Sequence, residues 1–325
     1  MKRTGYLHDP RYQLHDTGPY HPECSERLQA VHSGIEAGGL LPYLTPVKAL
    51  AADMKWIETI HTTAYIRRFE ELCLSGHKMF DFPDNQMCPD TYDTAILAVG
   101  GVLEAVRMLM AGEIDNGFCA VRPPGHHAEV DQAMGFCYFN NIAIAARYLQ
   151  LEWRVDRVAI IDFDVHHGNG TQHIFDQDPS VFYYSCHEHP TFAFPGTGRA
   201  FENGVGDGVG TTRNVPVLPG QGDEEYRKLV TEDMLPAVEA FKPQVILVST
   251  GFDAHEDDAM SGIRLTTEGY SWIMQQIVAL ADKVAEGRLI SLLEGGYSLE
   301  RLPVLARNHV AILLGRDGQG AQPID

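Results

Sequence analysis

The chain has 325 residues, a formal net charge of −19 and 44% apolar residues. That length suffices for one large α/β domain with a sizeable core, and the apolar fraction excludes a disordered chain. The negative charge disfavours direct binding of nucleic acids and suits cationic ligands such as basic peptides or polyamines, although it would serve solubility equally well.

The sequence carries no signal for a membrane or an export route. Its apolar runs fall short of the roughly 18 residues that a membrane helix needs, and residues 1–16 lack the apolar segment of a secretory signal. The six cysteines are scattered without a CxxC pair, which is typical of reduced thiols. We therefore expect a cytoplasmic protein without membrane contact, and leave a homo-oligomer open.

Short and almost continuous apolar runs alternate along the chain with longer helical patterns. The runs lie at 117–121, 157–162, 181–185, 245–250 and 288–293, and the helical patterns at 92–111, 138–151, 224–240 and 266–285. Continuous apolar runs are typical of parallel strands that helices cover on both faces. We predict an α/β fold: a single domain over residues 1–325, with three α/β/α layers around a mostly parallel, multi-stranded sheet.

Polar clusters directly follow four of these runs. They read RPPGHHA (122–128), DFDVHHGNG (162–170), GFDAH (251–255) and EGGY (294–297). In parallel sheets the ligand site lies outside the carboxyl ends of the strands. The four clusters should therefore meet at one edge of the sheet.

The second and third clusters contain a candidate metal site. Residues two apart in an extended segment point the same way, so Asp164 and His166 can face one point, with Asp162 on the same side. Asp253 can add a third ligand from another strand end. This set leaves a position open for water and suits zinc, although iron(II), cobalt or manganese would also accept it. Helix capping or ion pairing is the alternative role for these aspartates.

His126 and His127 lie in a loop that the preceding Pro-Pro-Gly makes rigid. Imidazoles suit general acid–base catalysis, and each needs a partner on its far nitrogen. Asp162 and Asn169 remain free for that role. A carboxylate partner raises basicity more than an amide does, so the two histidines should differ in pKa. A solvated loop is the alternative.

Tyr297 follows two glycines, which allow a tight turn beside the phenol. A phenol placed opposite a metal can donate a hydrogen bond to a developing oxyanion. Taken without the other clusters, this tyrosine would be an ordinary packing residue.

These segments, together with GFCYFNN (135–141) and FPGTG (194–198), resemble the histone deacetylase superfamily, which has the arginase/deacetylase fold. The resemblance covers nearly the whole chain, starting at HDTGPYHPECSERL (15–28). Asn169 and the EGGY segment are similar to the class II members.

The resemblance implies a zinc-dependent amidohydrolase. Asp164, His166 and Asp253 match the zinc ligands; His126 and His127 match the tandem histidines, with His127 the general base and acid; Asp162 and Asn169 match their partners; and Tyr297 matches the tyrosine that polarises the carbonyl. The family's structural potassium, in one or two sites, implies a first site formed by Asp162, the Ser185 hydroxyl and backbone carbonyls at Asp164, His166 and Cys186.

The resemblance also assigns residues to the substrate. Phe136 and Phe194 match the aromatic walls of an acyl-lysine tunnel, and Gly135 matches a backbone contact to the substrate amide. Arg27 resembles the arginine near an internal cavity through which acetate leaves.

Three substrate interpretations stay open. The first is removal of acetyl groups from acetyl-lysine in proteins or peptides, the second an N-acetylpolyamine amidohydrolase, and the third a catalytically silent binding module. Polyamine-specific relatives have a glutamate where this chain has Met260, which favours the first. The acidic run 256–258 either attracts a cation or forms a solvated loop. The complete set of catalytic residues disfavours the third.

Overall fold

The computed structural model describes residues 2–316 and centres on one eight-stranded sheet, in which each neighbouring pair of strands runs parallel. The strand order is β2-β1-β5-β10-β9-β6-β7-β8. The strands are β1 (Thr4–Leu7), β2 (Leu44–Val47), β5 (Asn116–Cys119), β6 (Val158–Asp162), β7 (Val181–Glu188), β8 (Thr212–Val217), β9 (Val245–Thr250) and β10 (Leu289–Leu293). A separate antiparallel ribbon pairs β3 (Met79–Phe80) with β4 (Phe82–Gln86).

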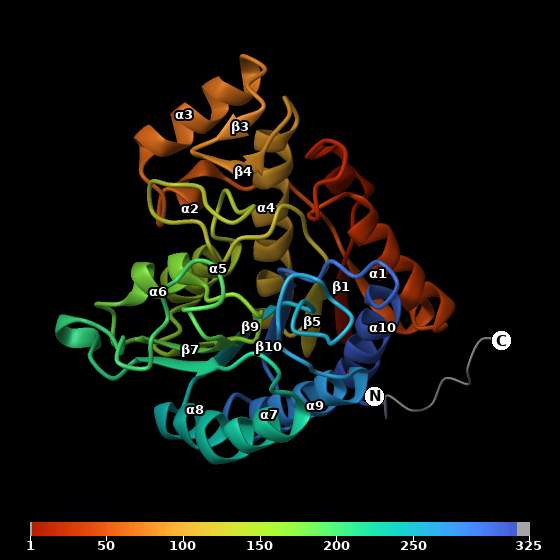
Figure 1. Cartoon of the computed structure of the whole chain (residues 1–325), viewed down its shortest axis with the longest axis vertical. Coiled ribbons are helices and arrows are strands. Elements are labelled where there is room, and N and C mark those ends of the chain that lie inside the picture. The colour runs from red at the N-terminus through yellow and green to blue at the C-terminus, as the bar shows by residue number, and fades with distance from the viewer. Residues whose placement is uncertain (1, 317–325) are drawn as a thin grey trace.

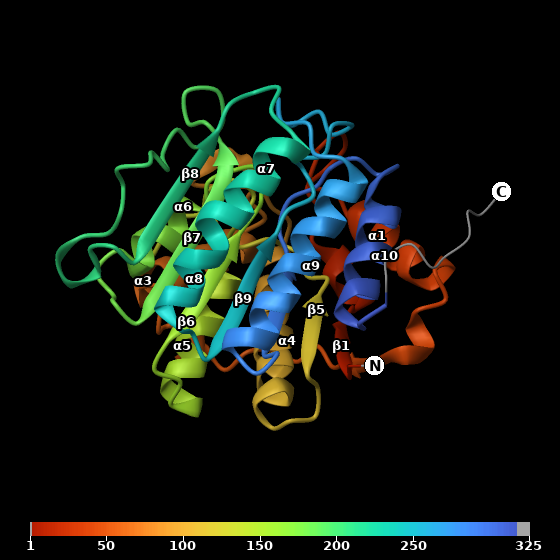
Figure 2. The ribbon, with the colours of Figure 1, turned by 90° about the horizontal axis from the view of Figure 1, so that it is seen from below.

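Helices cover both faces of the sheet, which confirms the predicted α/β/α layers. Figures 1 and 2 show α4 and α5 on one face and α7 to α10 on the other, where α1 packs against α10. The helical segments are η1 (Pro10–Leu14), α1 (Glu26–Ala37), η2 (Leu41–Tyr43), α2 (Met54–Ile57), α3 (Thr63–Leu74), α4 (Thr91–Met110), α5 (Asn141–Trp153), α6 (Asn169–Phe175), η3 (Gly206–Gly208), α7 (Asp223–Leu229), the π-helical η4 (Val230–Met234), α8 (Leu235–Phe241), α9 (Thr267–Val284) and α10 (Leu302–Leu313).

The predicted strands correspond to β5, β6, β7, β9 and β10, which are buried along their whole length. Burial on both faces explains their continuous apolar character. The predicted helix 224–240 is instead three segments, α7, η4 and α8, because the chain widens into a π-helical stretch just before Pro236. Among residues 2–316, we find no helix with both the length and the apolar character that spanning a membrane requires.

The strand register brings the polar clusters together. Asp162 ends β6 beside Ser249 of β9 and Ser185 of β7. β10 lies between β9 and β5, so the EGGY segment leaves the sheet between the GFDAH and RPPGHHA segments. The four clusters therefore share one edge of the sheet, as predicted.

Candidate active site

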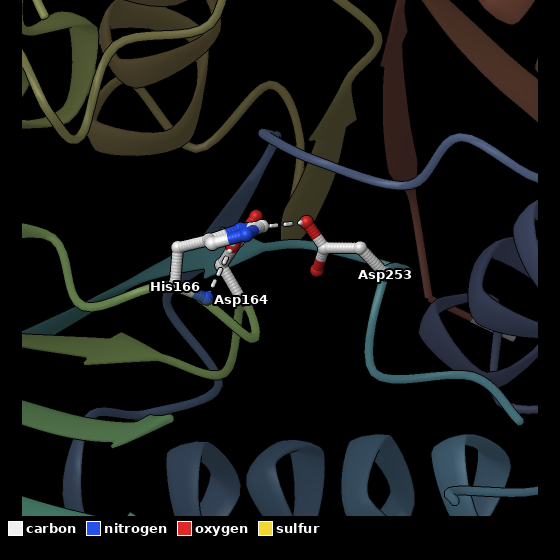
Figure 3. Close-up of side chains that lie close together, drawn as sticks. All are labelled: Asp164, His166 and Asp253. Carbon is white, nitrogen blue, oxygen red and sulfur yellow. Dashed lines mark hydrogen bonds and ion pairs between the residues drawn. The ribbon is translucent and has the colours of Figure 1, made fainter. Parts of the chain in front are cut away.

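Asp164, His166 and Asp253 converge at this edge (Figure 3). His166 Nδ1 lies 3.2 Å from Asp164 Oδ1 and 3.2 Å from Asp253 Oδ2, and one ligand atom of each residue falls within 4.8 Å of the others. All three are buried. Asp253 Oδ2 makes no hydrogen bond of acceptable geometry with the described residues. A buried carboxylate oxygen without a hydrogen bond, in a set of two carboxylates and an imidazole, fits a divalent cation.

The electrostatics of Asp253 support this fit. Burial and the negative charge of Asp164 both raise the pKa of Asp253. Two buried carboxylates so close together repel each other, and a cation between them would remove that repulsion. Backbone amides hold the outer oxygens: Gly295 N donates to Asp164 Oδ2 at 2.7 Å, and Val165 N donates to Asp253 Oδ1 at 3.0 Å.

Glycines make the close approach of these strand ends possible. A Cβ atom at Gly251 would lie 2.1 Å from Asp164 Oδ2, and one at Gly295 would lie 2.0 Å from Asp253 Oδ2. Both distances are far below van der Waals contact, and the blocking atoms are the candidate ligands themselves. The glycines that precede the aspartate in GFDAH and follow the glutamate in EGGY therefore belong to the site.

His126 is held by a carboxylate. Its Nδ1 lies 3.0 Å from Asp162 Oδ2, which also accepts a hydrogen bond from the Tyr183 hydroxyl at 2.9 Å. Burial works against the charged imidazole, but Asp162, Asp164 and Glu294 outweigh it and raise the pKa of His126 to about 10. This histidine is therefore a cation at neutral pH.

His127 is held by the side-chain amide of Asn169, and its charge differs from that of His126. Its Nδ1 lies 2.8 Å from Asn169 Oδ1, and its ring centroid lies 4.0 Å from that of His126. Burial lowers the pKa of His127 well below its usual value, and the nearby His126 and His166 lower it further. A neutral imidazole beside a charged one has the division that acid–base chemistry requires.

Tyr297 directly follows the Gly295–Gly296 turn, and its ring centroid lies 4.9 Å from the Arg27 guanidinium and 6.0 Å from the Phe136 ring centroid. Burial raises the pKa of its phenol well above the usual value. The hydroxyl therefore stays protonated and can donate a hydrogen bond.

Two of the predicted substrate residues, Phe194 and Gly135, lie beside His127. The Phe194 ring centroid lies 5.0 Å from that of His127, and the Phe194 side chain is exposed. Phe136 and Gly135 both adopt positive φ angles, and a Cβ atom at Gly135 would lie 2.4 Å from the His127 ring. Met260, which is partly exposed, is held through its backbone N–H by Asp258 Oδ1 at 3.0 Å.

Arg27 lies fully buried behind Tyr297. It donates to the carbonyl oxygens of Gly296 and Glu294, both at 2.6 Å, and to Glu23 at 3.0 Å. Its contacts fix the EGGY turn. The acetate-exit role stays a prediction.

Two acidic residues of the site have roles that the sequence did not reveal. Glu294 is buried; its Oε2 accepts the backbone N–H groups of Gly125 and His126 at 2.7 and 3.2 Å, and its Oε1 accepts the Ser249 hydroxyl at 3.0 Å. Burial raises the pKa of Glu294 to about 7. The position of Glu294 directly after a buried strand is the sequence feature that could have marked it as a site residue.

Asp258 corrects one expectation about the acidic run 256–258. It is only 5% exposed, and its Oδ2 accepts the backbone N–H groups of Tyr297 and Ser298 at 2.6 and 3.0 Å. Asp257 forms an ion pair with Arg301 at 2.7 Å. The run is therefore not a plain solvated loop, because two of its three carboxylates bind groups of this chain.

His167, which directly follows the candidate ligand His166, has both ring nitrogens within hydrogen-bonding distance of side chains of this chain. Nδ1 lies 2.8 Å from the Thr197 hydroxyl and Nε2 lies 2.8 Å from Gln172 Oε1. Ser185, the candidate potassium ligand, has its hydroxyl 2.7 Å from His187 Nδ1.

With this geometry established, the chain can be compared with known proteins. The sequence model of the histone deacetylase domain matches residues 21–313. The chain belongs to the histone deacetylase family. It is 40% identical to a probable deacetylase of Archaeoglobus fulgidus, over 97% of this chain and 87% of that protein.

Other members of the histone deacetylase family agree with this assignment. The chain is 34% identical to a histone deacetylase-like amidohydrolase of Pseudomonas aeruginosa, over 93% of this chain and 83% of the relative. The crystal structure of the HDA15 HD domain superposes with a TM-score of 0.91 at 34% identity, covering 99% of this chain and 90% of that one. The fold is thus the arginase/deacetylase-like fold of the histone deacetylases, and the family is one of hydrolases.

Proposed function

We propose that this histone deacetylase family member is a zinc-dependent amidohydrolase that removes acetyl groups from acetyl-lysine in proteins or peptides. The observation that supports this most directly is the buried Asp164–His166–Asp253 set, which lies beside one charged and one neutral histidine. A zinc ion bound there would supply a Lewis acid that polarises the acyl carbonyl and acidifies water.

The side chains of this chain would carry the proton transfers. His127 Nδ1 lies 2.8 Å from Asn169 Oδ1. With its proton on Nδ1, His127 would donate to that oxygen and keep Nε2 free to take a proton from the attacking water. The Tyr297 hydroxyl donates to the oxyanion that forms on the acyl carbon. The protonated His127 then returns its proton to the leaving amine, so acetate and free lysine result. Proton transfer and oxyanion stabilisation each contribute roughly 3 to 5 kcal/mol in comparable sites.

The acidic residues near Met260 favour acetyl-lysine over an acetylpolyamine. A polyamine would bring a second cationic group to the entrance of the site, where a free carboxylate should meet it. Asp258 instead binds backbone N–H groups and Asp257, although exposed like Glu256, binds Arg301. Among residues 2–316, Glu256 is then the member of the run whose carboxylate has no such partner. The apolar Met260 fits the methylene chain of lysine.

The proposal extends to a structural potassium ion and to the cellular setting. Asp162 and Ser185 are register neighbours, and oxygen donors suit a hard cation. Exit of acetate past Arg27, a cytoplasmic location, the absence of direct nucleic-acid binding and the state of oligomerisation also remain predictions.

Purified protein tests this proposal through its metal content and its substrate preference. Asp253→Asn should lose zinc and turnover together, whereas Tyr297→Phe should keep zinc and lower kcat by about 100- to 1000-fold. Tyr43→Phe, at an exposed tyrosine beside β2, is the control and should match the unaltered enzyme.

The same enzyme should hydrolyse an acetyl-lysine peptide with a kcat/KM at least about tenfold above that for acetylspermidine or acetylputrescine. The reverse preference would establish the polyamine alternative. A zinc-loaded protein that hydrolyses none of the three would instead be a binding module.

A further inference from the structure

Asn169, the hydrogen-bond partner of His127, also forms a hydrogen bond with the carboxylate of Glu129. Asn169 Oδ1 lies 2.8 Å from His127 Nδ1, while Asn169 Nδ2 donates to Glu129 Oε1 at 2.5 Å. Asn169 Nδ2 also lies 3.2 Å from the backbone carbonyl oxygen of His127. The amide thus bridges an imidazole and a carboxylate.

The chemistry of Glu129 decides which way the amide faces. An ionised carboxylate only accepts hydrogen bonds, so the NH₂ group of Asn169 must be the end that meets it. The amide oxygen must then face His127, and an oxygen can only accept. His127 therefore carries its proton on Nδ1, and its Nε2 keeps a lone pair.

We propose that Glu129 is a positioning residue that sets the tautomer of His127 through the amide of Asn169. This inference rests on the proposed role of His127 as general base. A carboxylate bound directly to the imidazole would set the tautomer and also attract a proton to the ring, as Asp162 does for His126. Placed one amide away, Glu129 sets the tautomer while His127 stays neutral.

The surroundings of Glu129 suit this role. The loop of the tandem histidines carries it, and its backbone N–H bonds to the Gln132 carbonyl oxygen at 2.9 Å. His173 of α6 lies on the solvent side, with Nδ1 2.8 Å from the same Oε1 atom, and shields the carboxylate so that the Glu129 side chain is 18% exposed. The His127 carbonyl favours the same amide orientation, but a charged acceptor at 2.5 Å holds an N–H group more strongly than a neutral one at 3.2 Å.

Glu129→Ala and Glu129→Gln test the inference in the zinc-loaded enzyme. The alanine variant should keep its zinc and fold but lower kcat by about 10- to 100-fold, with KM within about twofold. The glutamine variant should also lower kcat, because its amide can present either an oxygen or an NH₂ group to Asn169. Asp131→Asn, at an exposed acid two residues away, is the matched control and should leave kcat unchanged.

The deciding measurement is the tautomer itself. Nitrogen NMR of the ¹⁵N-histidine-labelled enzyme should show His127 protonated on Nδ1 in the unaltered protein, and a mixture of tautomers in Glu129→Ala. An unchanged tautomer in that variant, or a kcat within about twofold of the unaltered enzyme, would overturn the inference. Turnover that survives His127→Ala would instead refute the role of His127 as general base. The effect of Glu129 on the tautomer would still be tested by the NMR measurement.

Discussion

Asp162 and Asn169 hold neighbouring imidazoles through different chemical groups, and that difference sets the charge of each ring. The carboxylate of Asp162 stabilises the proton on His126, whereas the amide of Asn169 adds no charge to offset the burial of His127. A proton acceptor must start neutral, so His127 is suited to the transfer and His126 to stabilising negative charge.

This division predicts unequal damage from two matched substitutions. His127→Ala removes the proposed acceptor and should lower kcat by about 100- to 10,000-fold. His126→Ala removes a neighbouring cation and should cost less. Rate constants under substrate saturation, measured with equal zinc content, decide this. Equal losses, or a larger loss for His126→Ala, would contradict the assignment.

The residues that could be read from the sequence are those whose chemistry depends on side-chain type. Asp164, His166 and Asp253 were identifiable because imidazole and carboxylate at strand ends suggest a metal. The position of Glu294 after a buried strand could be read, but its role could not, and neither could the roles of Asp258 and Glu129. The partners of Glu294 and Asp258 are mainly backbone N–H groups, and that of Glu129 is an asparagine amide. Almost every residue type has a backbone N–H group, so contacts to such groups cannot be recognised from the amino-acid sequence.

At the scale of elements, the ends of β6, β9 and β10 approach so closely that side chains must be absent between them. Gly251→Ala tests this, because its Cβ atom would enter the space of Asp164 Oδ2. We expect zinc affinity to fall by about 10- to 100-fold. Competition with a chelator of known affinity measures the change.

Gly76→Ala is a contrasting variant for that experiment. Gly76 has a φ angle of 76°, and a Cβ atom there would meet nothing within 4 Å. The substitution should therefore cost about 1 kcal/mol of folding stability through its backbone conformation and leave zinc affinity unaltered. Equal zinc affinities in the two alanine variants would show that Gly251 has no special place in the site.

The sequence predicted the inner strands β5, β6, β7, β9 and β10 but not β1 or the two edge strands. β2 and β8 contain prolines and polar residues because each has a strand neighbour on one side only, so continuous apolar character is not required there. β1 reads TGYL between Arg3 and His8, so it lacks the continuous apolar run that marks β5 as GFCAV. The two edge strands were thus missed because of their position in the sheet, and β1 because of its composition.

Across the whole molecule, a buried charge cluster links the N-terminal segment to the sheet. Glu23 accepts hydrogen bonds from Arg122 at 2.5 and 2.8 Å and from Arg27 at 3.0 Å, and all three residues are buried. Burial opposes ionisation of Glu23, but the two arginines and His15 outweigh it and hold the pKa of the carboxyl far below its usual value.

This cluster predicts a pH dependence of stability. A carboxyl whose pKa is lower in the folded than in the unfolded state stabilises the fold above its unfolded pKa, near 4.5, and loses that contribution as the pH falls toward the folded value. Glu23→Gln should therefore cost about 3 to 5 kcal/mol at pH 7, and its deficit should shrink below about pH 4.5. Urea unfolding from pH 7 to pH 3 measures this.

Glu36→Gln, at an exposed carboxyl of helix α1, is the control and should stay within about 0.5 kcal/mol of the unaltered protein. A Glu23→Gln deficit that stays constant across the pH range would show that the carboxylate charge is not the source of the stability.

The strand order also has a consequence for how the molecule is made. Among residues 2–316, β10 is the last strand of the sheet to be synthesised, yet it lies inside the sheet between β5 and β9. Until residues 289–293 emerge, both of these strands have an unpaired inner edge, and such edges readily pair with other chains. The turn that carries Tyr297 directly follows β10. Arg27 is therefore synthesised 269 residues before Gly296, whose carbonyl oxygen it binds. The edge that carries the candidate site is therefore complete only after β10 has paired with both β5 and β9.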